Sequence, residues 1–277
     1  MSFGDLTRIN TNLQAMSSLN AMQKTNSQLG LRQMRLATGS RINRAEDDSA
    51  GYTIAKKLQA RVRGQEKALQ NIGDAKSMLT VGEGSLNSIM DILQTMKEKT
   101  VQAANDTMGT AERTAIENEL HALSSEVGDI LSDSTFNGTA LFSSANVALS
   151  FQVNAEEGDV FTATITSTTV AGIGVDTASL VVNSAASAGD TLLAIDGAID
   201  EISERIGTIG DSQKRLSFKQ DNLTVSMNNY EAARSRIEDA DFAKEQMEIV
   251  KLQILQQTGI ASLAQANAGP QSVLSLF

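Results

Sequence analysis

The chain has 277 residues, a formal net charge of −10, a single proline and neither Cys nor Trp. Without Cys it can form no disulfide and no thiolate metal site, and its negative charge argues against nucleic acid as a partner. Because proline is so scarce, helices can run over long stretches without a breaker, and a mainly α fold is expected.

Membrane binding is also disfavoured. No apolar run approaches the roughly 18–20 residues of a spanning helix. The polar face of the N-terminal segment is mostly Asn, Gln, Ser and Thr, which gives it little attraction to a lipid surface. The opening residues also lack the apolar core of a secretory signal peptide. If the protein leaves the cell, we expect export by another route.

The N-terminal segment predicts a helix with two thin apolar stripes. The first stripe contains Leu6, Ile9, Leu13 and Met16, and the second contains Met22, Leu29 and Leu36. Thr38, Gly39 and Ser40 are typical of a helix end. Because such thin stripes cannot make a stable domain alone, this helix needs partners.

Residues 48–104 repeat their apolar side chains every seven positions. One series contains Leu58, Ile72, Leu79, Leu86 and Leu93, and a second contains Ala68, Ala75, Gly82, Ile89, Met96 and Ala103. This is the spacing of a coiled-coil seam. Asp47 and Asp48 precede it and suit the positive end of a helix.

A shorter helix and a β-hairpin are predicted next. The helix carries Ile116, Leu120, Leu123, Val127 and Ile130 at spacings of three and four, and it ends at 132–134. Apolar residues then alternate in 147–153 and 161–165, which predicts a hairpin. Asn154 is expected in the left-handed conformation. Residues 167–189 are rich in small residues and predict either a short β excursion or a loose loop.

The most regular pattern lies in residues 192–237. Its spacing alternates between three and four through Leu192, Ile195, Ile199, Ile202, Ile206, Ile209, Gln213, Leu216, Gln220, Leu223, Met227, Tyr230, Arg234 and Ile237. This predicts a second long helix, antiparallel to the first, with the shorter helix as a third member of the bundle. Gln65, Gln213 and Gln220 occupy slots in the two seams, where they are either tolerated or fix the register of the helices.

The C-terminal segment predicts a helix with a face rich in small residues. That face contains Ala243, Met247, Val250, Ile254, Ala261, Ala264 and Ala268. The pair Gly269 and Pro270 is expected to kink or break this helix.

No constellation for catalysis is present in the sequence. The Ser residues have no His base within a recognisable motif, and the lone His121 has no Cys or second His with which to share a metal ion. No Gly-rich phosphate-binding signature occurs. We therefore expect no enzyme activity, no cofactor and no metal site.

Several segments resemble the bacterial flagellins. They are RINTN at 8–12, LATGSRIN at 36–43, AEDDSAG at 45–51, FNGT at 136–139, FQVNA at 151–155, RIEDADFA at 236–243 and LAQAN at 263–267. Within the fifth segment, Asn154 stands where the family often has Gly. The matching segments occur at both ends of the chain and in the family's order.

The resemblance implies a structural subunit that self-assembles into the bacterial flagellar filament used for swimming motility. The expected fold is mainly α and elongated, a long-helix coiled-coil bundle with a small β-hairpin. Residues 1–45 and 238–277 would pair as a separate inner coiled-coil domain, and 46–165 with 190–237 would form the middle bundle with the hairpin. Residues 166–189 would be a minimal outer loop in place of the outer domains of longer flagellins.

The resemblance also implies partners and a location. The partners are copies of the same chain in a helical homopolymer, an export chaperone, the filament cap and the hook–filament junction proteins. The location is extracellular, in the flagellum, reached through the flagellar export apparatus without a cleaved signal peptide. A hook–filament junction protein and a secreted coiled-coil adhesin are the alternatives.

Two groups of residues are candidates for function under this resemblance. The self-assembly residues of the inner coiled coil would be Leu6, Ile9, Leu13, Met16, Leu29, Leu36, Val250, Ile254, Ala261 and Ala264. A candidate innate-receptor region would contain Gln94, Thr95, Glu98, Lys99 and Glu119. There, Thr95 and Lys99 stand where flagellins that stimulate the animal Toll-like receptor typically carry Arg and Leu, so weak recognition is expected.

Overall fold

The computed structural model of the protein describes residues 11–142 and 145–274. These residues form α1 (Leu13–Thr38), α2 (Ser49–Ala103), α3 (Thr110–Asp133), β1 (Thr135–Phe136), β2 (Thr139–Ala140), β3 (Val147–Gln152), β4 (Val160–Ile165), α4 (Ala185–Glu238) and α5 (Phe242–Leu274). The mainly α fold with a small antiparallel sheet, expected from the sequence, is confirmed. The chain divides into two compact units, 1–60 with 229–277 and 61–228, and each is described by itself.

In unit 61–228, α2 and α4 pair in antiparallel fashion along the predicted seams. Ile72, Leu86 and Leu93 of α2 are fully buried, as are Ile195 and Ile202 of α4. Each residue comes seven positions after another in its own series, so one face of each helix remains turned toward its partner. The heptad spacing therefore identified this part of the core from the sequence.

The shorter helix α3 supplies the third member of this bundle, as predicted. Its residues Leu120 and Val127 are fully buried in the same apolar cluster as the α2–α4 seam. At its end, Ser134 Oγ donates a hydrogen bond to Ser85 Oγ at 2.7 Å, which places the last turn of α3 beside residue 85 of α2. Residues 61–84 of α2 therefore lie outside the stretch that α3 covers.

The predicted hairpin is β3–β4, which pairs from Val147 with Ile165 to Gln152 with Val160. Asn154, expected in the left-handed conformation, does not adopt it, because Gly158 supplies the positive φ of this turn at +89°. The Asn154 side chain instead accepts the backbone N–H of Ala155 at 2.8 Å. A short-range hydrogen bond of this kind offers Asn an alternative to a left-handed backbone.

A smaller hairpin, β1–β2, precedes it. Asn137 and Gly138 form its two-residue turn with φ of +48° and +78°. Asn followed by Gly is the preferred sequence for a turn with two positive φ angles, since these residues tolerate that conformation best. This small strand pair was not predicted from the sequence, where FNGT at 136–139 counted only as a segment that resembles the flagellins.

The segment 166–184 is packed against the bundle and is not a loose loop. Ile173, Val175, Leu180 and Val182 are buried in the common core. Polar contacts hold its backbone as well: Ser124 Oγ of α3 donates to the Val175 carbonyl at 2.7 Å. The expected loop also ends early, because residues from Ala185 onward are helical and belong to α4.

The last helix continues further than expected. The structure describes α5 as helical as far as Leu274, through Gly269 and Pro270. The predicted break at this pair is therefore wrong. Proline removes only its own N–H donor, so the remaining hydrogen bonds of the helix can continue past it at a local cost.

Two leucines should differ sharply in their contribution to stability. Leu93 is fully buried, whereas Leu193 is 71% exposed on α4. We expect Leu93→Ala to lower the free energy of unfolding by roughly 2–5 kcal/mol, because it leaves a cavity in the seam. Leu193→Ala should change it by less than about 0.5 kcal/mol. Urea unfolding of both variants measures the difference, and equal effects would contradict this placement of the core.

Candidate functional site

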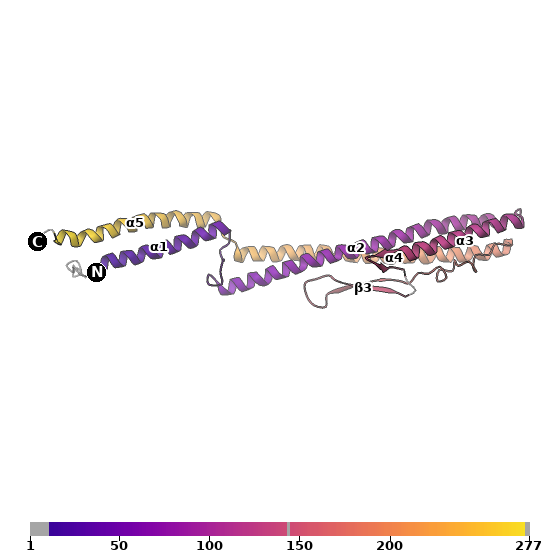
Figure 1. Cartoon of the computed structure of the whole chain (residues 1–277), viewed down its shortest axis with the longest axis horizontal. Coiled ribbons are helices and arrows are strands. Elements are labelled where there is room, and N and C mark those ends of the chain that lie inside the picture. Colours follow the sequence, from indigo (N-terminus) through magenta and orange to yellow (C-terminus); the bar gives the residue numbers. More distant parts are fainter. Residues whose placement is uncertain (1–10, 143–144, 275–277) are drawn as a thin grey trace. The chain divides into compact units, whose positions relative to one another are not determined.

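Helices α1 and α5 lie side by side and antiparallel within their unit (Figure 1). Near one end of the pair, Arg32 Nη1 donates hydrogen bonds to both carboxylate oxygens of Glu245, at 2.8 and 2.9 Å. Near the other end, Asn12 Nδ2 donates to the carbonyl of Ala266 at 2.8 Å. The residue number falls on α1 as it rises on α5, so the two helices run in opposite directions.

The contact between these helices is narrow and partly polar. On α5 the buried or half-buried side facing α1 contains Glu245, Ile249, Leu252, Gln256, Gly259, Leu263 and Ala266. On α1 the half-buried positions include Ala15, Ser18, Met22, Thr25, Leu29, Arg32 and Leu36. No described residue of α1 is fully buried. The pair alone therefore covers only one side of α5.

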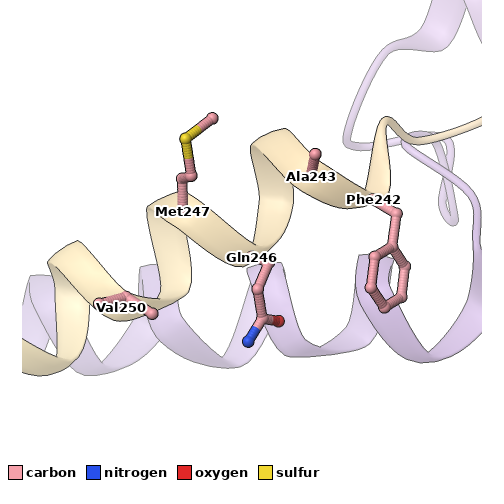
Figure 2. Close-up of a pocket in the computed structure, with 5 residues that line it drawn as sticks. All are labelled: Phe242, Ala243, Gln246, Met247 and Val250. Carbon is pink, nitrogen blue, oxygen red and sulfur yellow. The ribbon is translucent and has the colours of Figure 1, made fainter.

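The opposite side of α5 is apolar and exposed. Met247 is 67%, Val250 46% and Ile254 58% exposed. Figure 2 shows Met247 and Val250 on the first turns of the helix, with Phe242 and Gln246 lining the same shallow pocket. Exposed apolar patches of this kind on a soluble protein mark interaction surfaces.

This exposed face is the stripe predicted from the sequence. Each of its positions from Ala243 to Ala264 precedes a position of the α1-facing stripe by two residues, as Met247 precedes Ile249. Two residues on an α-helix subtend about 200°, so the two stripes lie on opposite faces. The α1-facing stripe was missed because Glu245, Gln256 and Gly259 interrupt its apolar character, although its three–four spacing is regular.

The predicted self-assembly residues divide between these environments. The exposed members are Leu13, Met16, Val250, Ile254, Ala261 and Ala264. Leu29 and Leu36 are half-buried on the side of α1 that faces α5. Leu6 and Ile9 lie outside the described residues. Six of the predicted side chains are thus available to another molecule.

A buried charge lies between the terminal helices. The Glu245 side chain is 6% exposed and contacts Arg32, and Arg35 Nη1 lies 3.9 Å from its carboxylate. Burying a carboxylate is costly unless it is paired and hydrogen-bonded. The two arginines therefore favour the alignment of α5 along α1 in which Glu245 lies beside Arg32 and Arg35.

The segment that follows α1 is hydrogen-bonded to the segment that precedes α5. The Arg41 backbone N–H donates to the Glu238 carbonyl at 2.6 Å, and the Ala240 N–H donates to the Gly39 carbonyl at 2.8 Å. Gly39 has a φ of +70°, a conformation that side-chain-bearing residues rarely adopt. These bonds fix the two connections side by side.

Asp47 organises the connection before α2. Its carboxylate accepts the backbone N–H groups of Asn43 and Arg44 at 3.0 Å each. The hydrogen bond from Arg44 and then that from Asn43 are the main causes that lower the Asp47 pKa below its usual value, and the nearby charges of Arg35 and Arg44 lower it further. The ionised form of Asp47 is therefore part of the folded connection.

The candidate receptor region lies on α2 and α3. Gln94, Thr95 and Glu98 are exposed on α2. Lys99 forms an ion pair with Glu119 of α3 at 2.7 Å. The structure thus brings together two of the five predicted residues. The Glu119 carboxylate is paired with the Lys99 ammonium and is not free to contact another molecule.

No metal site or spanning helix is found in the part of the chain that the structure describes. Across residues 11–142 and 145–274, no three His, Cys, Asp or Glu side chains gather in a way that could hold a metal ion. No helix in those residues is long and apolar enough to cross a bilayer.

Comparison with known protein families decides the family of this chain. The pattern of the bacterial flagellin N-terminal helical region matches residues 9–147, and that of the bacterial flagellin C-terminal helical region matches residues 192–277. The chain belongs to the bacterial flagellin family. The two matched regions contain both terminal helices and most of the α2–α4 bundle.

Individual relatives agree with this assignment. The flagellin of Halalkalibacterium halodurans is 35% identical over 269 residues, which cover 97% of this chain and 99% of that protein. Flagellin FlaB1 of Treponema pallidum is 34% identical over 284 residues, with 97% and 99% covered. The chain is therefore a self-assembling structural subunit of the flagellar filament and not an enzyme. A hook–filament junction protein or an adhesin is not favoured.

A solved structure shows the same fold. A putative flagellar hook-associated protein from Vibrio parahaemolyticus superimposes with a TM-score of 0.59 and 16% identity, covering 70% of this chain and 100% of that chain. At this identity the similarity concerns the fold alone.

The lowered pKa of Asp47 makes its contribution to stability depend on pH. Because the folded-state pKa lies below the unfolded value of about 3.9, this contribution is fully present above that value and is lost as the pH falls through the folded-state pKa. We expect Asp47→Asn to lower the thermal unfolding midpoint at pH 7. The difference from the parent protein should vanish at pH values below the folded-state pKa.

The control for this measurement is Asp74→Asn, which neutralises an exposed acid on α2. It should leave the midpoint nearly unchanged at pH 7. If Asp47→Asn and Asp74→Asn behave alike across the pH range, the two backbone hydrogen bonds of Asp47 do not stabilise the fold.

Proposed function

We propose that the chain polymerises through the exposed apolar faces of its terminal helices. The observation that carries this proposal is the stripe on α5 that contains Met247, Val250 and Ile254, 46–67% exposed while the opposite face packs against α1. Burial of apolar area is the main favourable term in protein association. A second copy of the chain, with its own exposed residues Leu13 and Met16, offers a matching apolar surface.

The proposal divides the chain as follows. Residues 1–45 and 238–277 form the inner coiled-coil domain at the filament core, and 46–165 with 190–237 form the middle bundle with its hairpin. Residues 166–189 take the place of outer domains. The tight packing of 166–184 against α3 supports this last point, because its buried side chains leave little chain to project outward.

The family supplies the other partners and the route. Export through the flagellar apparatus, without a cleaved signal peptide, would deliver the chain to the extracellular filament. An export chaperone, the filament cap and the junction proteins would meet it on the way. The absence of Cys from the chain is consistent with this route, since no disulfide has to form after export.

Recognition by the Toll-like receptor should be weak. Thr95 lacks the forked guanidinium that an Arg would offer, and its hydroxyl donates to the Asp91 carbonyl within its own helix. Lys99 places a charge where an apolar contact is expected. Its ion pair also ties up the carboxylate of Glu119, which is itself a predicted receptor contact. Both departures remove favourable contacts from the same surface.

Charges placed on the exposed stripe should block polymerisation. In the double variant Val250→Asp with Ile254→Asp, two carboxylates would have to be buried without partners at each contact. We expect the critical concentration for filament growth, measured by sedimentation, to rise by at least about tenfold, which corresponds to roughly 1.4 kcal/mol per subunit. Circular dichroism should show unchanged helix content.

The matched control places one charge on the flank of the same helix. Ser262 is exposed on α5 and lies about 60° beyond Met247, the nearest residue of the stripe. The single variant Ser262→Asp should polymerise almost normally. Normal growth of the stripe variant, or equal loss in both variants, would exclude the stripe as the assembly surface.

The receptor proposal is tested by restoring the two departing residues. Thr95→Arg with Lys99→Leu should raise signalling in a receptor reporter assay, because it supplies the guanidinium and removes the ion pair that occupies Glu119. The control, Thr80→Arg with Lys67→Leu, makes the same changes at other exposed positions of α2 and should have no effect. Strong signalling by the parent protein would contradict the proposal.

A further inference from the structure

Among the residues that the structure describes, the two exposed methionines both lie on the terminal helices. Met247 of α5 is 67% exposed and Met16 of α1 is 55% exposed. Figure 2 shows the Met247 side chain pointing out from α5, away from α1. The other described methionines are half-buried or buried: Met22, Met34, Met78, Met90, Met96, Met108 and Met227. A reagent in solution therefore meets the sulfur atoms of Met16 and Met247 first.

Methionine is the side chain of this protein with which an oxidant reacts most readily. The sequence has no Cys, whose thiolate would otherwise compete for the oxidant. In the reaction with hydrogen peroxide, a lone pair of the thioether sulfur attacks one oxygen atom, an S–O bond forms and the O–O bond breaks. The sulfur loses two electrons, and the second oxygen takes up the proton of the first and leaves as water. The product is methionine sulfoxide, which reductases convert back to methionine with electrons from thiols.

Met247 lies inside the exposed apolar stripe of α5. Val250 and Ile254 follow it on the same face at i+3 and i+7. The sulfoxide oxygen is a hydrogen-bond acceptor that water satisfies while this face is exposed, and neither Val250 nor Ile254 has a donor to offer in its place. A second apolar surface that covered the oxidised stripe would therefore bury an acceptor without a partner.

Met16 has a corresponding position on α1. Leu13 precedes it by three residues and is 44% exposed, so the two side chains lie on one exposed apolar face. This is the face that would meet the α5 stripe of another copy. Oxidation can therefore place an acceptor without a partner on either side of the contact between copies.

We propose that Met16 and Met247 form an oxidation site through which peroxides regulate polymerisation. Oxidised subunits stay folded but add poorly to a filament, and reduction of the two sulfoxides restores their growth. The inference rests on the proposed function, because it requires the exposed stripes to be the assembly surface.

The bundle is protected from the same reaction. Met78 and Met96 of α2 have no exposed surface and lie in the apolar core of unit 61–228. The oxidant reaches them only when the bundle opens. Helix content should therefore be unchanged while Met16 and Met247 are modified.

Oxidation of the half-buried methionines on α1 offers a rival explanation. Met22 lies beside Gly259 of α5, on the side of α1 that faces that helix. A sulfoxide at Met22, or at the half-buried Met34, would weaken polymerisation by loosening the α1–α5 pair and not by changing the exposed stripes. The test therefore includes a variant without these two sulfur atoms.

Three double variants of the full chain separate these effects. Met16→Leu with Met247→Leu keeps both side chains apolar and removes both exposed sulfur atoms. Met22→Leu with Met34→Leu is the matched control, since it removes two half-buried sulfur atoms from the same unit. Met16→Gln with Met247→Gln places polar amides at the two exposed positions without any oxidant.

Each protein is treated with hydrogen peroxide as free subunits, and the peroxide is then removed with catalase. The critical concentration for filament growth is measured by sedimentation and compared with that of the same protein before treatment. Peptide mass spectrometry locates the added oxygen atoms, and circular dichroism follows the helix content.

In the parent and in the matched control, we expect oxygen at residues 16 and 247 before residues 78 and 96. Their critical concentration should rise at least about fivefold, as for a buried acceptor left without a partner at each contact. The variant Met16→Leu with Met247→Leu should change by less than about twofold. The Gln variant should grow poorly without oxidant, and methionine sulfoxide reductases for both epimers should restore the oxidised parent.

A loss of growth in treated Met16→Leu with Met247→Leu equal to that of the parent would assign the effect to other methionines and overturn the inference. Normal growth of a parent that carries both sulfoxides would overturn it as well. In that case the Gln variant decides on the proposed function. Poor growth of the Gln variant would leave the assembly surface in place, whereas normal growth would exclude both stripes.

Discussion

Burial of heptad-spaced Leu and Ile side chains between α2 and α4 is the interaction on which unit 61–228 depends. With one proline in the chain and no disulfide, neither rigid turns nor covalent links constrain the fold. The long seam must therefore supply a large part of the apolar contact, and the other elements add to it. Helix α3, the hairpin β3–β4 and the segment 166–184 all place apolar residues in the same cluster.

The contact between the terminal helices α1 and α5 is less apolar than the α2–α4 seam. Their mutual contact contains Glu245, Gln256 and small residues, and it leaves an apolar face of α5 uncovered. In a protein that worked as a monomer such a face would favour aggregation. In a filament subunit, neighbouring copies can cover such a face. The buried ion pair of Glu245 aligns the two helices, and the apolar face of α5 stays free for the contact between copies that we propose.

Much of this could be predicted from the sequence, because the long helices have a strict period. The positions of Leu93 and Ile202 in the core follow directly from their spacing. The α1-facing side of α5 could not be recognised, since a stripe containing Glu245 and Gly259 has no apolar signal even though its geometry is regular. The packing of 166–184 was missed for a related reason: the backbone at Val175, Leu180 and Val182 is hydrogen-bonded by side chains of α3 that are remote in sequence. Local pattern carries no information on such partners.

The packed segment also has a consequence for how the chain can be modified. Its residues Thr177, Ala178 and Ser179 are exposed, whereas Val175 before them and Leu180 after them are buried. A guest peptide placed in this short turn would be carried outward between two fixed anchors, and insertions are best tolerated at such exposed turns. In a polymer of identical copies, that single position would become a dense and regular array for displaying epitopes or enzymes. The turn at Thr177, Ala178 and Ser179 is therefore a suitable position for presenting many copies of a guest peptide.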